Sequence, residues 1–449
     1  MERMQLMKKK KHRHITSVQV IILGFLSVIL LGTLLLMLPP ATQGRSRAPF
    51  MDALFTSTSA VCVTGLALHD TATYWSSFGQ GIILLLIQIG GMGVVTVAVS
   101  IVTLSGRKIG LMQRSTMQEA ISAPQVGGIV RMTSFILKTT VSIELIGAAV
   151  LAPVFCREFG LVNGIWYALF HSISAFCNAG FDLIGVKAPF SSLTPYAAQP
   201  VVNCAIMALI VTGGIGFLTW EDIKVHKWHL KKYRMQSKVI LTVTGILIAA
   251  PAVYFFLFEF SDLPLGQNVW TSLFQSVTTR TAGFNTADLT QLSETGQLLM
   301  ILLMLIGGSP GSTAGGMKTT TIAVLFSSAL SVFRRREHAH FFRRRIPEDT
   351  IRSAAIILLL YLVLFLSGGM LICRIEGVPL ISALFETASA IGTVGLSLGI
   401  TPELGPISRV ILITLMFFGR VGGLTLIFAA LSETHDGGAK YPKEKITVG

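Results

Sequence analysis

The chain has 449 residues, of which 52% are hydrophobic and 13% are charged, and its mean hydropathy is +0.68. This composition excludes an ordinary soluble domain and predicts a membrane protein that crosses the bilayer several times. The formal net charge is +14, but the basic clusters flank apolar runs. We therefore expect these clusters to orient the chain and to attract anionic membrane lipid, and we expect no nucleic acid partner.

Eight apolar runs are long enough to cross a bilayer as helices, which takes roughly twenty residues each. They cover residues 17–38, 79–104, 132–155, 199–219, 239–260, 298–332, 354–373 and 407–431. The runs form four pairs, and a shorter segment lies between the two members of each pair. An even number of crossings places both chain termini on the same side of the membrane.

The four short segments resemble one another and end at Gly65, Gly180, Gly283 and Gly395, which are 115, 103 and 112 residues apart. This spacing predicts four repeats of one unit. Each segment has about thirteen residues, which is too short for a span, so we expect a re-entrant helix followed by a backbone turn. Non-helical backbone at membrane depth needs protein or a water-filled cavity around it, so the turns should face a pore.

The turns are the candidate cation site, because rings of backbone carbonyl oxygens can replace the water around a dehydrated cation. Each preceding helix would also direct its negative dipole end at the cation. One glycine alone would more often be a packing contact, but four at matched positions argue for a shared filter. The predicted filter residues are Val63, Thr64, Gly65, Asn178, Ala179, Gly180, Thr281, Ala282, Gly283, Thr393, Val394 and Gly395, with K+ held by their carbonyl groups only.

Two charged residues lie in these segments. Arg280 precedes the third triplet, where it would either repel cations or brace the filter from behind, and we favour bracing. Glu386 lies early in the fourth segment, and we interpret it as a partner of the positive helix end and not as an ion ligand. The third segment is one residue shorter than the others, which leaves its alignment before Thr278 open.

The sixth apolar run is interrupted by a segment that cannot continue a helix, because it is rich in glycine and contains a proline. We predict a loop at membrane depth that acts as a gate. The predicted gating residues are Gly307, Gly308, Ser309, Pro310, Gly311, Ser312, Thr313, Ala314, Gly315, Gly316 and Lys318. A phosphate-binding loop is disfavoured, because one residue separates the last glycine from the lysine and no strand precedes it. Glycines in the second, fourth and eighth runs predict close helix packing instead.

Arg420 is the single charge in the last apolar run, and a charge at membrane depth is functional and paired by default. We expect Arg420 and Lys318 to place positive barriers near the gate, with loop carbonyls and hydroxyls such as those of Ser309, Ser312 and Thr313 as partners. A structural ion pair is the alternative for Arg420. For Glu144 and Lys138, in the third run, we expect a structural pair or snorkelling.

Basic residues are distributed unevenly between the two sides that eight crossings imply. The side with the termini carries 26 of the 36 Lys and Arg residues, whereas the other carries six, namely Arg45, Arg47, Arg157, Lys187, Arg374 and Arg409. This asymmetry predicts that both termini lie in the cytoplasm. We expect a cytosolic basic N-terminus at residues 1–16, repeats at 17–110, 111–235, 236–345 and 346–435, and a cytosolic tail at 436–449.

The chain resembles the Trk/Ktr/HKT superfamily of potassium transporters, most closely its bacterial KtrB-type membrane subunit. The resemblance rests on the four glycine turns, the interrupted helix and Arg420. The resemblance covers nearly the whole chain. It implies an all-α polytopic membrane protein with four M1–pore helix–M2 repeats, or eight transmembrane helices and four re-entrant pore loops, around one pseudo-fourfold pore. It also implies that residues 307–316 form the gating loop, with Lys318 and Arg420 beside it.

The resemblance further implies a homodimer in the bacterial plasma membrane and a cytosolic ring of regulator-of-conductance (KtrA-type) subunits. Nucleotides would bind to that ring, no cofactor would bind to this chain, and Na+ would be a possible activator. We expect channel-like, gated potassium uptake. The alternative is a secondary active symporter that couples K+ to Na+ or H+, although such transporters usually bind their substrates between inverted repeats. An enzyme is disfavoured, because the runs contain no metal-ligand cluster, nucleophile–base pair or carboxylate pair.

Overall fold

The computed structural model describes residues 16–104, 110–121 and 127–422. Within these ranges the fold is almost entirely helical, and the only strands are the short antiparallel pair β1 (His340–Phe341) and β2 (Arg344–Arg345). Four helices are long and apolar enough to cross a membrane: α1 (Ser17–Leu36), α7 (Ile129–Phe159), α11 (Met235–Tyr254, continued by a π-helical turn over Phe255–Glu259) and α15 (Glu348–Glu376). Leucines on their outer faces are exposed, as expected for helices whose solvent is lipid.

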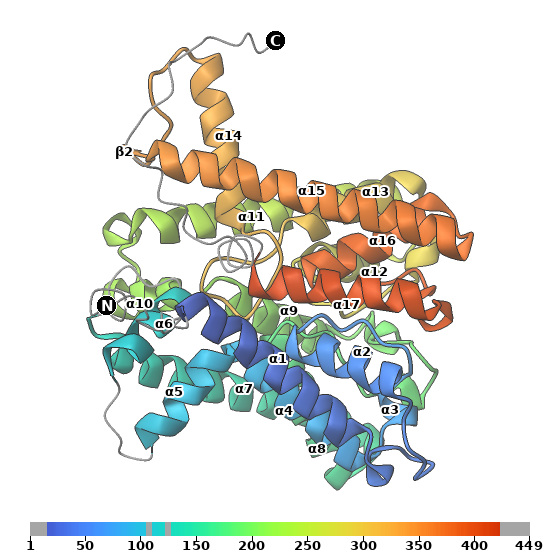
Figure 1. The fold of residues 1–449 in the computed structure, drawn as a ribbon. Coiled ribbons are helices and arrows are strands. Elements are labelled where there is room, and N and C mark those ends of the chain that lie inside the picture. Colours follow the sequence, from blue (N-terminus) through green and yellow to red (C-terminus); the bar gives the residue numbers. More distant parts are fainter. Residues whose placement is uncertain (1–15, 105–109, 122–126, 423–449) are drawn as a thin grey trace, which may run out of the picture.

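Each long helix begins a repeat of helix, pore helix and second helix (Figure 1). The pore helices are α2 (Phe50–Val61), α8 (Leu161–Phe176), α12 (Leu265–Thr278) and α16 (Leu380–Gly392). The second helices are α4 (Ser77–Met92), α9 (Pro200–Gly214), α13 (Glu294–Leu305) and α17 (Pro406–Val421). In every repeat the pore helix packs against the long helix that precedes it. The predicted helical architecture with four repeats is therefore confirmed.

Two of the predicted continuous spans are wrong, because the second helix breaks at a glycine. The run 79–104 bends by 93° between α4 and α5 (Val94–Leu104), and the run 199–219 bends by 98° between α9 and α10 (Phe217–His226). The φ angles at the breaks are 86° at Gly93 and 91° at Gly216, in a region that side chains rarely allow. The predicted extension of the last run to residue 431 lies outside the described residues.

In repeat 3 the second helix is interrupted, as predicted: the chain leaves the helical conformation between α13 and α14 (Thr319–Phe333). In Figure 1, α14 runs at a steep angle to α15, and β2 lies beside the start of α15. The remaining helices are α3 (Thr71–Tyr74) and α6 (Leu111–Ile121), and the sequence did not predict α6. Single 3-10 turns cover Pro39–Ala41, Ile184–Val186, Thr194–Tyr196, Leu230–Lys232, Leu289–Gln291 and Thr401–Glu403.

Glycines hold three of the second helices against the ends of the pore helices. A Cβ added at Gly90, Gly213 or Gly419 would overlap the carbonyl oxygen of a residue at the end of the adjacent pore helix, in each case well inside contact distance. The predicted close packing at these glycines is thus confirmed. Because the approach is backbone to backbone, the second helix fixes where the pore helix ends.

The arrangement has one seam where no chain connection joins neighbouring repeats, between repeat 4 and repeat 1, and α17 closes it from both ends. Near its start, Arg409 Nη1 donates to Asp52 Oδ1 at 2.9 Å. The other oxygen, Asp52 Oδ2, lies 2.8 Å from Nε2 of His69. At the last turn of α17, the guanidinium of Arg420 donates to the carbonyl of Gly90.

We expect Arg409→Ala to lower the free energy of unfolding by about 2 kcal/mol, because it leaves the largely buried Asp52 carboxylate without its cation. The measurement is the apparent melting temperature of the purified chain in detergent. Arg374→Ala is the matched control, since this exposed arginine makes no ion pair among the described residues. Equal melting temperatures for Arg409→Ala and the control would contradict a stabilising role for the seam.

Candidate functional site

Every pore helix ends in the same unusual backbone turn. The residue that opens each predicted triplet has a positive φ: 51° at Val63, 57° at Asn178, 63° at Thr281 and 51° at Thr393. Left-handed backbone costs of order 1–3 kcal/mol for a residue with a side chain, and most for β-branched residues such as valine and threonine. The sequence did not predict this strain. Its fourfold recurrence shows that the surrounding structure imposes one conformation on four different triplets.

The four glycines form a closed ring. A Cβ added to any of them would collide with the carbonyl oxygen just before the glycine of the next repeat: at 2.5 Å from Ala179 O for Gly65 and 2.8 Å from Ala282 O for Gly180. Gly283 would meet Val394 O and Gly395 would meet Thr64 O at closer range still. The contacts run from repeat 1 to 2, 3, 4 and back to 1. Four backbones therefore converge on one axis, which any side chain at these positions would obstruct.

Hydroxyl groups inside the pore helices hold the ring in place. Ser59 and Ser389 accept hydrogen bonds from the N–H groups of Gly65 and Gly395, at 3.1 and 3.0 Å. In repeat 2, Ser174 Oγ donates to the carbonyl of the residue after the ring glycine, at 2.7 Å. Each of these serines lies six residues before its glycine.

Repeat 3 resolves the alignment that the sequence left open. Thr278 Oγ1 donates to Phe284 O at 2.5 Å, so Thr278 takes the position of the serines although it lies only five residues before Gly283. The backbone adjusts by a tighter bond, from Ala282 N to Thr278 O at 2.9 Å. One residue is thus missing between the anchor hydroxyl and the ring glycine.

Polar side chains in the pore helices also hold the loop that follows each ring glycine. His171 Nε2 accepts from the N–H of Leu183 at 3.3 Å, and Gln275 Nε2 donates to Asn285 Oδ1 at 3.0 Å. At the matched position of repeat 4, Glu386 accepts from Thr401 Oγ1 at 3.0 Å. The interpretation of Glu386 as a partner of the positive helix end is wrong, because the residue lies in the middle of α16 and its carboxylate holds the outer loop.

Arg280 is buried, with 4% of its surface exposed, and its Nε and Nη2 atoms have no hydrogen-bond partner among the described residues. Within the described ranges, these two guanidinium atoms therefore form no hydrogen bond that would brace the filter in the predicted way. The connection behind the third triplet runs through the backbone instead, where the carbonyl of Arg280 accepts from Asn178 Nδ2 at 3.4 Å.

A vestibule of about 220 Å³ opens on the side of the ring that faces α3 and the outer loops. The four ring glycines line it together with Asp70 and Asp182. Burial, together with the nearby charge of Asp70, raises the pKa of the Asp182 carboxyl to about 7. The Asp182 carboxylate would therefore attract cations to the ring at alkaline pH and lose its charge under mild acid.

The interrupted segment lies on the opposite side of the ring and is bonded to three helices. Its backbone donates from Ser309 N to Gly214 O at 3.0 Å and from Gly316 N to Gly419 O at 3.0 Å, and Gly311 O accepts from Phe217 N at 2.7 Å. These partners belong to α9, α17 and α10. Non-helical backbone at this depth is thus satisfied by protein, as a span in lipid requires.

The same segment also touches the filter triplets directly. Thr313 Oγ1 lies 2.9 Å from Asn178 Oδ1 and 3.0 Å from Phe176 O. A Cβ added at Gly315 would overlap the side chain of Thr393. The segment is therefore packed against the second and fourth triplets, and it cannot move without breaking these contacts.

Both predicted charges lie beside this segment. Arg420 Nη1 donates to the carbonyl of Thr313, and Lys318 Nζ donates to Ala314 O at 2.9 Å. The expected carbonyl partners are confirmed. The Ser309 and Ser312 hydroxyls bond within residues 309–319 instead.

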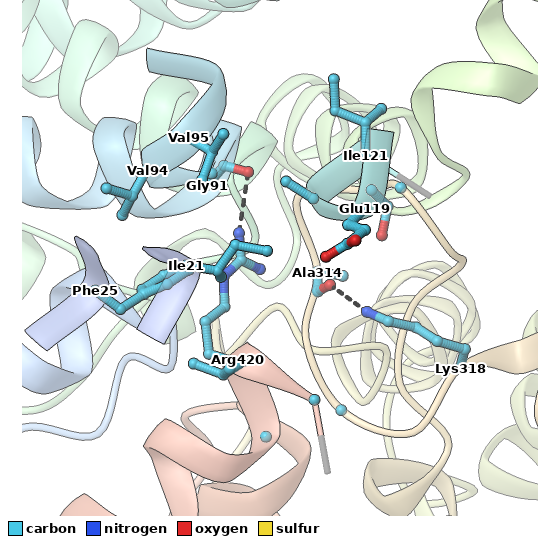
Figure 2. A pocket seen from close by; sticks show the side chains of 18 of the residues that line it. Ile21, Phe25, Gly91, Val94, Val95, Glu119, Ile121, Ala314, Lys318 and Arg420 are labelled. Atoms are coloured by element: carbon cyan, nitrogen blue, oxygen red, sulfur yellow. Dashed lines mark hydrogen bonds between the residues drawn. The ribbon is translucent and has the colours of Figure 1, made fainter. Parts of the chain in front are cut away.

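Arg420 and Lys318 share a cavity of about 340 Å³ on the far side of the segment from the ring (Figure 2). Helices from all four repeats contribute to its wall, including α1, α10, α14 and α17. The ring, the interrupted segment and this cavity therefore follow one another along the axis.

Glu144 lies behind the second triplet, with 4% of its surface exposed. Gln88 Nε2 donates to its carboxyl at 3.2 Å, and Cys177 Sγ lies 3.9 Å from the other oxygen. Lys138 is exposed, and no ion pair joins it to Glu144. The predicted structural pair is wrong, and the alternative of snorkelling fits Lys138 alone.

The ring of glycines and the helical repeats agree with the known proteins that this chain resembles. Residues 3–437 match the family model TrkH, described as a cation transport protein. This chain belongs to the TrkH family of cation transport proteins. It is therefore a transport protein and not an enzyme, as the sequence predicted, and the predicted family resemblance is confirmed.

Relatives of similar length match over almost the whole chain. The potassium/sodium uptake protein NtpJ of Enterococcus hirae is 39% identical over 99% of this chain and 100% of its own length. The Ktr system potassium uptake protein B of Bacillus subtilis is 38% identical over 97% of both chains. The crystal structure of the potassium transporter TrkH from Vibrio parahaemolyticus superposes with a TM-score of 0.74 at 20% identity, covering 95% of this chain and 86% of that one, which shows a shared fold.

We expect cation uptake to fall as the pH on the vestibule side drops through about 7, where the raised pKa of Asp182 leads to loss of its charge. The reduction between pH 8 and pH 6 should be roughly twofold to fivefold, and Asp182→Asn should flatten the profile at the lower level. The measurement is rubidium uptake into liposomes at several external pH values.

Asp288→Asn is the control for this experiment, because hydrogen bonds from Thr290 lower the pKa of Asp288 and it stays charged throughout the pH range. It does not line the vestibule. An unchanged pH profile in Asp182→Asn would show that another group is responsible.

Proposed function

We propose that this chain is the ion-translocating subunit of a potassium uptake system, with gated, channel-like permeation through the ring of four glycines. The closed ring carries the proposal, because it brings backbone carbonyl groups of four repeats to one axis where they can replace the hydration shell of a cation. The names of two relatives, both potassium uptake proteins, support K+ as the ion.

The gate in this proposal is the loop of residues 307–316, with Lys318 and Arg420 beside it. The loop contacts the second and fourth triplets, so in this proposal it closes the path beneath the ring until its bonds to α9, α10 and α17 break. In this structure the loop is bonded to the second triplet through Thr313. The positive charges of Lys318 and Arg420 add an electrostatic barrier next to the path, and displacement of the loop would change the position of both side chains relative to the path.

Gly395→Ser tests the filter. The φ of Gly395 is 94°, and an added Cβ would overlap Thr64 O, so the ring must distort and its fit to K+ must weaken. We expect the preference for K+ over Na+ to fall by about tenfold or more, which corresponds to one lost carbonyl contact. The measurement is the competition of Na+ with K+ uptake in liposomes.

Gly399→Ser is a matched control for this test. Gly399 has the same φ of 94°, but nothing lies within 4 Å of an added Cβ, so it carries the backbone strain without the collision in the ring. If Gly395→Ser and Gly399→Ser show the same ion preference as the unaltered protein, the ring is not the filter.

Deletion of Gly311–Gly315 tests the gate, and we expect it to raise potassium flux. Thr313→Val is the milder variant: it keeps the shape but removes the hydroxyl that bonds to Asn178 and Phe176, and should raise flux by up to about tenfold. Ser312→Ala is the control, because its hydroxyl bonds only to Ser309 within the loop. Reduced or unchanged flux in both gate variants would exclude this gating role.

A secondary active symporter of K+ with Na+ or H+ is the alternative, and the name of the potassium/sodium uptake relative favours testing it. Passive permeation predicts a reversal potential set by the K+ gradient alone. Coupling predicts a shift of the reversal potential when the Na+ or H+ gradient changes at a fixed K+ gradient. The same recordings report whether Na+ activates flux without being carried.

We further propose a homodimer with one pore per protomer, controlled by a cytosolic nucleotide-binding ring of regulator-of-conductance (KtrA-type) subunits. The name of a Ktr system relative supports a multi-subunit system. We place the chain in the bacterial cell membrane with both termini in the cytoplasm, on the side of α6, α10 and the basic strand pair. The uneven distribution of Lys and Arg supports this orientation.

A further inference from the structure

The short helix α6 reaches the gating loop from the side of the proposed cytosolic mouth. It packs against α1, α5 and α7 through buried residues such as Met117 and Ile121. The carbonyl oxygen of Ile121 lies 2.6 Å from where a Cβ would stand on Gly311. The end of α6 therefore touches the backbone of the loop.

Glu119 lies one half-turn before this contact and is exposed. Figure 2 shows its carboxylate pointing from α6 into the cavity, toward the carbonyl of Ala314 that accepts the hydrogen bond from Lys318. Among the described residues, Glu119 has no cation within 4.0 Å. The carboxylate thus lines the same cavity as the two cations but forms an ion pair with neither one.

Few of the described residues that line this cavity are charged. Within the described ranges they are Glu119, Lys318 and Arg420. Both cations are turned toward loop and helix carbonyls, whereas the carboxylate faces the open volume. An ion that leaves the ring through a displaced loop would enter this volume and meet the carboxylate before it meets bulk solvent.

We propose that Glu119 sets the cation concentration in the inner cavity: its carboxylate raises the local concentration of K+ and offsets the positive barrier of Lys318 and Arg420. The proposal rests on the proposed permeation path. A carboxylate in a partly enclosed volume attracts cations more strongly than one on an open surface, because low-dielectric walls focus its field. It acts on the ion directly and needs no contact with the loop.

The test is potassium flux through the full chain in liposomes. Glu119→Gln should lower flux about fivefold at low ionic strength, in line with the size of single exposed charge effects, and the difference should shrink at about 1 M salt of an impermeant cation, where the Debye length is about 3 Å. Glu119→Asp should restore most of the flux because it keeps the charge. Glu337→Gln is the matched control, since Glu337 is an exposed carboxylate on the same side but does not line the cavity.

The loss should also depend on the neighbouring cation. Removing the carboxylate should matter less in a Lys318→Gln background, because part of the barrier that it offsets is then gone. Higher flux in Glu119→Gln would overturn the proposal, since it would mean that the residue restrains the loop. Equal flux in Glu119→Gln and unaltered protein, or a loss in Glu119→Asp that no salt concentration changes, would also overturn it. The deletion of Gly311–Gly315 distinguishes this outcome from failure of the proposed permeation path. If the path is wrong, the deletion leaves potassium flux unchanged both with and without the Glu119 substitution.

Discussion

The close approach of four backbones at Gly65, Gly180, Gly283 and Gly395 is the constraint on which the rest of the structure depends. Each glycine lies where a methyl group would collide with a carbonyl oxygen of the next repeat. Such a ring tolerates no side chain and no shift of one repeat relative to another. The pore helices must therefore end at one level, which the glycines of α4, α9 and α17 secure by packing against the pore-helix ends, and hydroxyl groups such as Ser59 must hold each turn.

A ring made from one chain also needs to be closed. Three of its four junctions are joined by the chain itself, and the fourth is held by α17, with an ion pair at its start and a guanidinium at its last turn. The same guanidinium donates to the loop beneath the ring. Arg420 thus connects the seam to the interrupted segment. A movement of the loop would therefore shift the Arg420 side chain and its bond to Gly90, where repeats 1 and 4 meet. This is a physical link between two elements, and it follows from one side chain having several donors.

Charges at membrane depth are satisfied here mainly by carbonyl oxygens and not by acidic residues. Lys318 and Arg420 donate to backbone exposed by the interruption of one helix and the breaks of others. A helical span would offer no such carbonyls, because its own N–H groups occupy them. The broken helices therefore supply the acceptors that Lys318 and Arg420 use. Glu144 shows the complementary case, where a buried carboxyl is held by the neutral side chains of Gln88 and Cys177.

The sequence by itself determined the repeat architecture, the four turns, the interrupted helix and the positions of Lys318 and Arg420, because hydropathy, glycine spacing and isolated charges report on local constraints. It did not determine the sharp breaks at Gly93 and Gly216, the existence of α6, the role of Glu386 or the partner of Glu144. A glycine is compatible with both packing and a break, and a carboxylate is compatible with several partners. Only the tertiary structure decided between these, since the left-handed turns at Val63 and Thr393 and the contacts of the ring arise from neighbours that are distant in the chain.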